Sequence, residues 1–179
     1  MIRRKNNMTF VPNVEFKKKL LDVHLEDKIK YCYQCDRCTS VCPVAEATNN
    51  RYNPRTIIMG AMLGLPQLVL GAEDNFKIWG CQVCDTCDEK CPNDIELTEI
   101  FNLVKNISVQ QGTAPEYYTM QAKTILENGK AIPSQSAIER RRKKYGLPPV
   151  PKCNVDEIQN ILKQTELDKK LKYKWVEEQ

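Results

Sequence analysis

The 179-residue sequence predicts a mostly α-helical protein. Apolar residues recur at helical spacing in several segments, and capping residues, prolines and glycines stand where helices would begin and end. No segment shows the sustained alternation of apolar and polar residues that is typical of a strand. Eight of the nine cysteines fall into two tight groups between the helical segments, which indicates that bound metal supplements a small core.

The N-terminal segment, residues 1–29, is expected to begin irregularly and then form a helix. Asn13 is a candidate N-cap, and Phe16, Leu20, Leu21 and either Val23 or His24 follow at roughly helical spacing. This segment leads directly into the first cysteine group.

The second expected helix runs from Pro54 to about Leu63. Asn53 supplies a capping side chain, the proline suits the first helical position, and Gly64 suits the end. Pro66 is expected to open a second short turn that closes at Gly71. The apolar stretch from Ile57 to Leu70 is interpreted as core packed over the metal sites, with a membrane-facing or partner-facing patch as the alternative.

The third expected helix follows the second cysteine group and stops before Gly112, with one apolar face formed by Leu97, Ile100, Phe101, Val104 and Ile107. This helix closes a cysteine-bearing domain over residues 30–112. Residues 113–179 are expected to form a helical C-terminal extension. Its helices should cover about 115–128, ending at Gly129, and 136–145, ending at Gly146. A last helix should be capped by Asn154 with Glu157.

The two cysteine groups share the spacing C-x2-C-x2-C-x3-C-P. Their residues are Cys32, Cys35, Cys38, Cys42 and Pro43 in the first and Cys81, Cys84, Cys87, Cys91 and Pro92 in the second. Three cysteines at such gaps place three thiolates around one loop, which suits three corners of an iron–sulfur cubane. The fourth cysteine of each group should be turned away from this loop by a helix that starts at that cysteine. It should therefore ligate the cluster held by the other group.

This argument predicts two [4Fe–4S] clusters with crossed ligands. The first cluster would bind Cys32, Cys35, Cys38 and Cys91, and the second would bind Cys81, Cys84, Cys87 and Cys42. Donors near the first group could bond to the inorganic sulfides; they are Gln34, Asp36, Arg37, Thr39 and Ser40. The alternative is zinc, but zinc sites usually use separated C-x2-C pairs, and neither group has that form.

Three weaker candidates have simpler explanations. Cys153 has no neighbouring cysteine and is interpreted as a free thiol, and His24, the only histidine, as a surface or core residue. The basic run from Arg140 through Arg141, Arg142 and Lys143 to Lys144 is interpreted as a solvated helix face, with a docking surface for an acidic partner as the alternative.

Composition narrows the classes of function. A net charge of +4 is too small to argue for nucleic-acid binding, and no G-x-G-x-x-G motif indicates a nucleotide. No secretory signal is visible, and the apolar stretch from Ile57 to Ala72 is too short to span a bilayer, so we expect a soluble cytoplasmic protein. Because no nucleophile and base remain beside the eight ligands, we expect no catalytic residue, only electron transfer.

The two motifs, the segment NPRTIIMGAMLG between them, IWGC before the second and YGLPPVP in the tail resemble the small iron–sulfur subunit, the C subunit, of the heterodisulfide reductase of methanogens. The motifs alone are shared by many α-helical ferredoxin domains, including those of succinate dehydrogenase and fumarate reductase. The resemblance implies a helical dicluster ferredoxin domain.

It also implies a role as the electron relay of an oxidoreductase complex. Electrons would pass from a flavin-containing A subunit to a catalytic B subunit, which reduces the coenzyme M–coenzyme B heterodisulfide in methanogenesis. A hydrogenase or formate dehydrogenase often supplies the electrons. The alternatives are the iron–sulfur subunit of another oxidoreductase, such as a fumarate reductase-like complex, and a zinc-bound interaction module.

Overall fold

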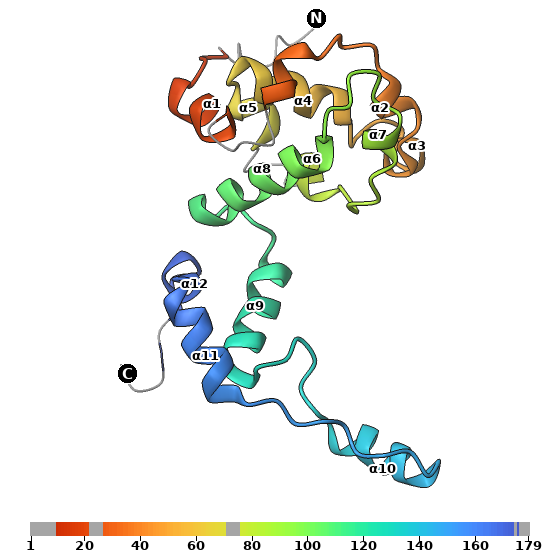
Figure 1. The fold of residues 1–179 in the computed structure, drawn as a ribbon, viewed down its shortest axis with the longest axis vertical. Helices are drawn as coiled ribbons and strands as arrows, with labels where there is room; N and C mark the ends of the chain where they lie inside the picture. Colours follow the sequence, from red (N-terminus) through yellow and green to blue (C-terminus); the bar gives the residue numbers. More distant parts are fainter. Residues whose placement is uncertain (1–9, 22–26, 71–75, 174, 176–179) are drawn as a thin grey trace, which may run out of the picture. The chain divides into compact units, whose positions relative to one another are not determined.

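The computed structural model describes residues 10–21, 27–70, 76–173 and 175, and these residues form helices and connecting loops without a strand. The predicted mostly α-helical fold is therefore confirmed. The chain divides into two compact units, Met1–Ala114 and Pro115–Gln179, which are described separately (Figure 1).

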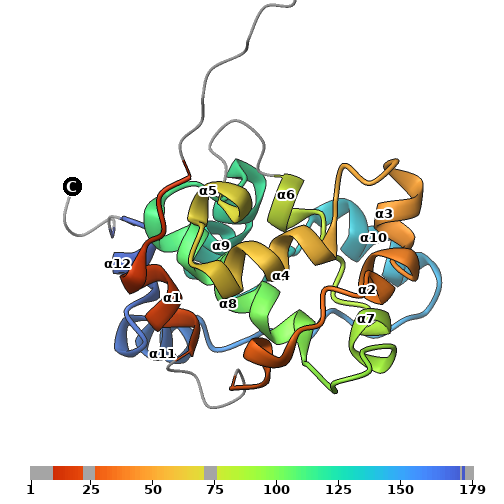
Figure 2. The same ribbon diagram turned by 90° about the horizontal axis from the view of Figure 1, so that it is seen from above.

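The first unit contains several short helices around two longer ones. In chain order they are α1 (Val14–Leu21), the 3-10 helix η1 (Asp27–Tyr31), α2 (Arg37–Ser40), α3 (Pro43–Ala47), α4 (Pro54–Leu63), α5 (Pro66–Val69), α6 (Phe76–Trp79), α7 (Thr86–Glu89) and α8 (Leu97–Gln111). The short helices α2, α3 and α7 gather at one end of this unit in both views (Figures 1 and 2). The two cysteine motifs therefore meet at that end.

The caps of the longer helices are the ones that the sequence predicts. The side chain of Asn13 accepts a hydrogen bond from the backbone N–H of Phe16 at 2.8 Å, and that of Asn53 accepts from Thr56 at 2.9 Å. Gly64 ends α4 with a φ of 69°, and its carbonyl accepts from the backbone N–H of Asn13 at 2.7 Å. The end of α4 is thus tied to the start of α1.

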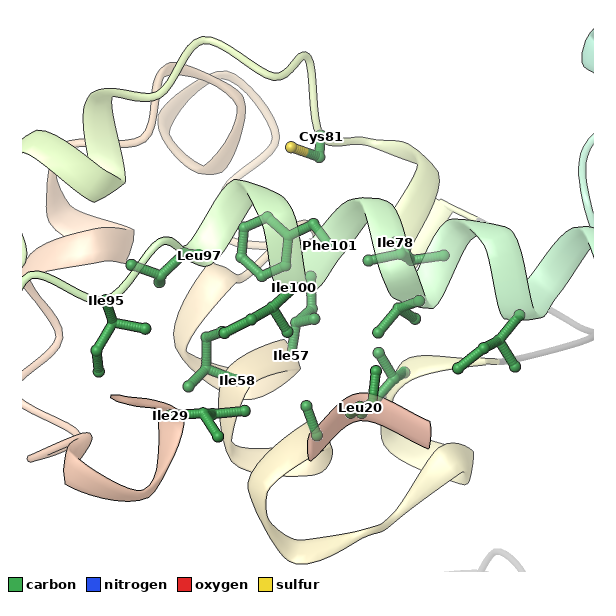
Figure 3. Close-up of a cluster of buried hydrophobic side chains, with 14 of the residues drawn as sticks. Leu20, Ile29, Ile57, Ile58, Ile78, Cys81, Ile95, Leu97, Ile100 and Phe101 are labelled. Atoms are coloured by element: carbon green, nitrogen blue, oxygen red, sulfur yellow. The ribbon is translucent and has the colours of Figure 1, made fainter. Parts of the chain in front are cut away.

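The core of the first unit lies between α4 and α8. Ile57 and Ile58 of α4 face Ile100 and Phe101 of α8, and Leu20 of α1 packs below them (Figure 3). Ala61 of α4 and Val69 of α5 are also almost completely buried, so the apolar stretch from Ile57 to Leu70 contributes to the core, although Leu63 is exposed. Cys81 and Cys87 belong to the same cluster, which places two metal-binding candidates within the core.

The second unit contains α9 (Glu116–Asn128), α10 (Ser136–Lys144), α11 (Val155–Gln164) and α12 (Leu167–Lys170). Helices α9 and α11 pack together around Leu126, and the side chain of Gln159 donates to the carbonyl of Leu126 at 2.9 Å. Asn154 caps α11 by accepting from the N–H of Glu157 at 3.3 Å, as predicted. The basic run lies on α10, where no side chain is buried.

Several sequence predictions fall beyond the described residues or differ from the structure. His24 and Gly71 lie outside the described residues, so neither expectation is tested. The short helices η1, α2, α6, α7 and α12 were not expected, because one turn of helix is too short to show a periodic pattern. Among the described residues, no helix is long and apolar enough to cross a membrane.

Candidate metal centres

The two motif loops adopt the same backbone shape at equivalent positions. Gln34 and Asp36 flank the second cysteine of the first motif with φ of 56° and 69°, and Val83 and Asp85 do so in the second with 52° and 57°. A left-handed conformation costs a non-glycine residue roughly 1–2 kcal/mol. Four such residues in matching places show that the loops are shaped to turn around their thiols.

The third cysteine of each motif lies on a short helix that follows this turn. Cys38 lies on α2 and Cys87 on α7, and the two helices pack against each other. Burial raises the pKa of the Cys38 thiol to about 11. It also raises the pKa of Cys87, where the neighbouring carboxylate of Asp88 adds to the effect. Both thiols therefore ionise readily only when a cation compensates the thiolate charge.

One pocket brings cysteines of both motifs together. Cys32, Cys35 and Cys38 line it from the first motif, and Cys91 lines it from the second. Ile58, Ile95 and Leu97 add apolar side chains to its wall, and Arg37 and Arg55 also line it. These four thiols are the set that the crossed spacing argument predicts for one cluster.

A chain of hydrogen bonds between polar side chains reaches the pocket lined by Cys32, Cys35, Cys38 and Cys91. The amide of Gln34 donates to the sulfur of Cys32 at 3.3 Å, and its oxygen accepts from Nε of Arg55 at 3.4 Å. Thr39 bonds to the sulfur of Cys38 through its side chain and its backbone, and its hydroxyl also pairs with the Asn53 side chain at 3.2 Å. The hydroxyl of Ser40 instead donates to a backbone carbonyl. Thr39 and Ser40 therefore shape the loop and the start of α4.

Three of the four remaining cysteines interact with a different buried side chain, Tyr52. This residue is 1% exposed. Burial raises the pKa of Tyr52, and the charges of Cys81, Cys42 and Cys87 raise it further. These three cysteines belong to the second predicted set. The fourth, Cys84, is exposed, and its pKa is lowered by a hydrogen bond with Thr86.

Backbone donors point to sulfurs in this second region. The N–H of Ala45 donates to Cys42 at 3.5 Å, and that of Val83 donates to Cys81 at 3.4 Å. Cys42 is also the N-cap of α3, with Pro43 at the first helical position. The fourth cysteine of the first motif is thus directed by a helix that starts beside it, as predicted.

The fourth cysteine of the second motif is held differently. After Cys91 and Pro92 the chain makes a turn with Asp94 at a φ of 50°, and the next helix, α8, begins only at Leu97. The expectation of a helix at this cysteine is therefore wrong, because the segment from 93 to 96 is used to bring the chain back onto the core.

Helix α8 is anchored to the second motif by polar contacts that the sequence did not indicate. The carboxylate of Asp88 accepts from the backbone N–H of Thr98 at 3.2 Å and from its hydroxyl. The ammonium group of Lys105 donates to the carbonyl of Cys81 at 3.0 Å and lies 5.7 Å from the centre of the Trp79 ring. Partial burial lowers the pKa of Lys105.

Cys153 is separate from the eight motif cysteines in sequence and lies in the second unit. Its thiol donates to the carbonyl of Asn128 at 3.5 Å, beside the end of α9. A Cβ added at Gly129 would lie 2.9 Å from its sulfur, so the thiol is tightly packed there. These contacts agree with its interpretation as a free thiol.

The chemistry of the donors fits iron–sulfur clusters. All nine cysteines carry free thiols. Thiolates are the ligands that such clusters require, and backbone and amide donors to sulfur are typical of their surroundings. Among the described residues, no three His, Cys, Asp or Glu side chains form a ready site for a single metal ion.

Sequence reasoning did not identify Tyr52, Arg55 or Lys105 as neighbours of the thiols. Tyr52 and Arg55 flank the Asn53-Pro54 helix start, and Lys105 lies among the apolar positions of α8. No local pattern distinguishes them, because their proximity to sulfur arises only from tertiary packing.

Comparison with known proteins supports the same chemistry. Residues 28–95 match the 4Fe-4S dicluster domain family. The chain is 34% identical to the second iron-sulfur C subunit of the CoB–CoM heterodisulfide reductase of Methanocaldococcus jannaschii, an alignment that covers 94% of this chain and 91% of the relative.

Two further relatives come from other organisms. The C2 subunit of the H2/formate:CoB-CoM heterodisulfide,ferredoxin reductase of Methanococcus maripaludis is 33% identical, with 82% of this chain and 80% of the relative aligned. The C subunit of the H2:CoB-CoM heterodisulfide,ferredoxin reductase of Methanothermobacter thermautotrophicus is 27% identical, with 98% of this chain and 96% of the relative aligned.

Proposed function

This chain belongs to the family of the iron–sulfur C subunits of heterodisulfide reductases, and we propose that it relays electrons through two [4Fe–4S] clusters within such a complex. The observation that carries the proposal is the pocket in which Cys91 of the second motif joins Cys32, Cys35 and Cys38 of the first. Such clusters supply one-electron transfer when they are bound.

The proposed ligand sets are the crossed ones. Cys32, Cys35, Cys38 and Cys91 would hold one cluster, and Cys81, Cys84, Cys87 and Cys42 would hold the other. The shared pocket supports the first set, and the grouping of Cys42, Cys81 and Cys87 around Tyr52 supports the second. The clusters would lie in the domain of residues 30–112, with 1–29 and 113–179 as flanking parts.

This chain's own residues would then perform three tasks. The eight thiolates bind the clusters, and the apolar walls of α4 and α8 exclude water from the buried thiols. Polar groups such as Gln34 and the N–H of Val83 stabilise sulfur charge. None of these groups is placed to perform acid–base or nucleophilic chemistry on a substrate, so we propose a non-catalytic relay.

The proposed partners follow from the family. Electrons would enter from a flavin-containing A subunit and leave to a catalytic B subunit, which reduces the CoM–CoB heterodisulfide. A hydrogenase or formate dehydrogenase would supply electrons to the larger complex. The names of the relatives, which include H2 and formate, support this setting. We also propose a cytoplasmic location, since so many reduced thiols suit a reducing compartment.

Anaerobic purification from the native organism tests this function. The expected protein is brown, contains about eight irons per chain because the doubled motif holds two cubanes, and co-purifies with the flavin-containing and catalytic subunits. Dithionite-reduced complex should then reoxidise on addition of the heterodisulfide. A colourless protein loaded with zinc would end the cluster proposal, and recovery with a fumarate reductase flavoprotein instead would end the proposed setting.

A further inference from the structure

The hydroxyl of Tyr52 is buried, and no oxygen or nitrogen atom of the described residues forms a hydrogen bond with it. An unsatisfied buried hydroxyl costs about 1–3 kcal/mol, and native proteins rarely leave one unless it has a role. The described residues around it supply no oxygen or nitrogen acceptor. The groups that interact with it electrostatically are Cys81, Cys42 and Cys87, and the sulfur of Cys81 also acts as a hydrogen-bond acceptor for it.

The ring of Tyr52 is held from several sides. It makes edge-to-face contacts with Phe76 and Phe101, with ring centres 6.5 Å and 6.4 Å apart. Its backbone N–H donates to the hydroxyl of Thr48 at 3.3 Å. Gly80 closes another side, since a Cβ there would lie 2.9 Å from Cδ2 of the tyrosine ring. The direction of the hydroxyl is therefore set by packing.

The hydroxyl of Tyr52 is not needed to fill the space at this position. A phenylalanine would satisfy the same aromatic contacts without burying a hydroxyl, so packing alone does not explain the oxygen. Thiolates and inorganic sulfides are acceptors for a phenol donor, and donors to such sulfurs tune the reduction potential of a cluster.

We propose that the Tyr52 hydroxyl donates a hydrogen bond to the sulfur shell of the cluster held by Cys81, Cys84, Cys87 and Cys42, and thereby raises its reduction potential. This inference rests on the proposed function, because it requires that cluster to be present. Reduction adds negative charge to the sulfurs, so a donor stabilises the reduced state more than the oxidised state. The first cluster would depend on a different donor, Gln34, oriented by Arg55.

The test is an anaerobic redox titration of Tyr52→Phe, followed by electron paramagnetic resonance. We expect both clusters to assemble and the reduced-to-oxidised ratio of the second cluster, at the wild-type midpoint, to fall about 3- to 10-fold; tenfold corresponds to about 59 mV for one electron. The first cluster should keep its midpoint. Signals are assigned to clusters with Cys35→Ser and Cys84→Ser, which alter one ligand set each.

Tyr117→Phe is the matched control, since it removes a phenol hydroxyl from an exposed residue of the second unit. It should leave both midpoints unchanged. Equal midpoints in wild type and Tyr52→Phe, with two clusters in each, would overturn the inference while leaving the proposed function intact. Absence of clusters from the wild-type protein would instead refute the proposed function.

A second variant decides the question if Tyr52→Phe loses its second cluster. Site-specific replacement of Tyr52 by 3-fluorotyrosine keeps the ring and makes the hydroxyl a stronger donor. The midpoint potential of the second cluster should then be higher than in the wild-type protein, the opposite of the shift expected for Tyr52→Phe. An unchanged midpoint in this variant would also overturn the inference.

Discussion

The eight motif cysteines differ in how far each one enters the core. Cys81 and Cys87 are buried within the apolar cluster, whereas Cys35 and Cys84, the second cysteine of each motif, are exposed. A buried thiol surrounded by apolar side chains resists ionisation unless a cation is bound. With the proposed clusters bound, the interior thiols would therefore be the ones that couple metal binding to folding.

Cys42 provides the sharpest test of crossed ligation at the scale of one residue. We expect Cys42→Ser to lose the cluster of the second motif, because the serine hydroxyl is a poorer ligand than a thiolate. Iron should fall from about eight to about four per chain, while the first motif keeps its cubane. Iron analysis and electron paramagnetic resonance of the anaerobic protein measure this.

Cys153→Ser is the control for that experiment, because its thiol is hydrogen-bonded to Asn128 in the second unit. It should retain about eight irons, as expected of a residue outside both motifs. Loss confined to the cluster of the first motif in Cys42→Ser would contradict the crossed assignment.

At the scale of elements, the longer helices and the one-turn helices have different origins. Helices α4, α8 and α9 each end at a left-handed glycine, and α4 also begins at the Asn53 cap. The one-turn helices α2 and α7 have neither a side-chain cap nor a glycine end, and they pack against each other. Helices with a capping side chain or a glycine end could therefore be predicted from sequence, whereas α2 and α7 could not.

The end of α4 offers a test of how elements are joined. We expect Gly64→Ala to destabilise the protein by about 2–3 kcal/mol, of which about 1 kcal/mol is the left-handed backbone. The rest arises because the added Cβ would lie 3.0 Å from the carbonyl oxygen of Asn13, which must then move. Anaerobic denaturant unfolding measures the difference.

Gly112→Ala is the matched control. Gly112 ends α8 with a φ of 73°, but an added Cβ would meet nothing within 4 Å. It should therefore cost only about 1 kcal/mol from the backbone. Equal losses in the two variants would show that the contact between α1 and α4 contributes nothing to stability.

At the scale of the whole molecule, the two units depend differently on metal. The first contains all eight motif cysteines, and six of them lie in or against its apolar core. The second is built on α9 and α11 around Leu126 without any of these eight. Metal binding should thus contribute to the folding of the first unit alone.

Removal of iron tests this division. After chelation under anaerobic conditions, we expect amide hydrogen exchange in α8 to accelerate at least tenfold, equivalent to about 1.4 kcal/mol of lost protection. Amides of α9 and α11 should keep their protection. Equal acceleration in α8 and in the α9–α11 pair would show that the clusters stabilise the whole chain.

The helical class, the longer helices and the dicluster chemistry could be predicted from the sequence alone. Each of these depends on signals within a few residues: a side chain that caps the next turn, or thiols spaced around one loop. Which side chains lie beside the cysteine sulfurs depends on the tertiary packing. Cys91 reaches the pocket of the first motif, and Tyr52 lies among the second set of thiols, because the packing of α2 on α7 and of α4 on α8 joins segments far apart in the chain.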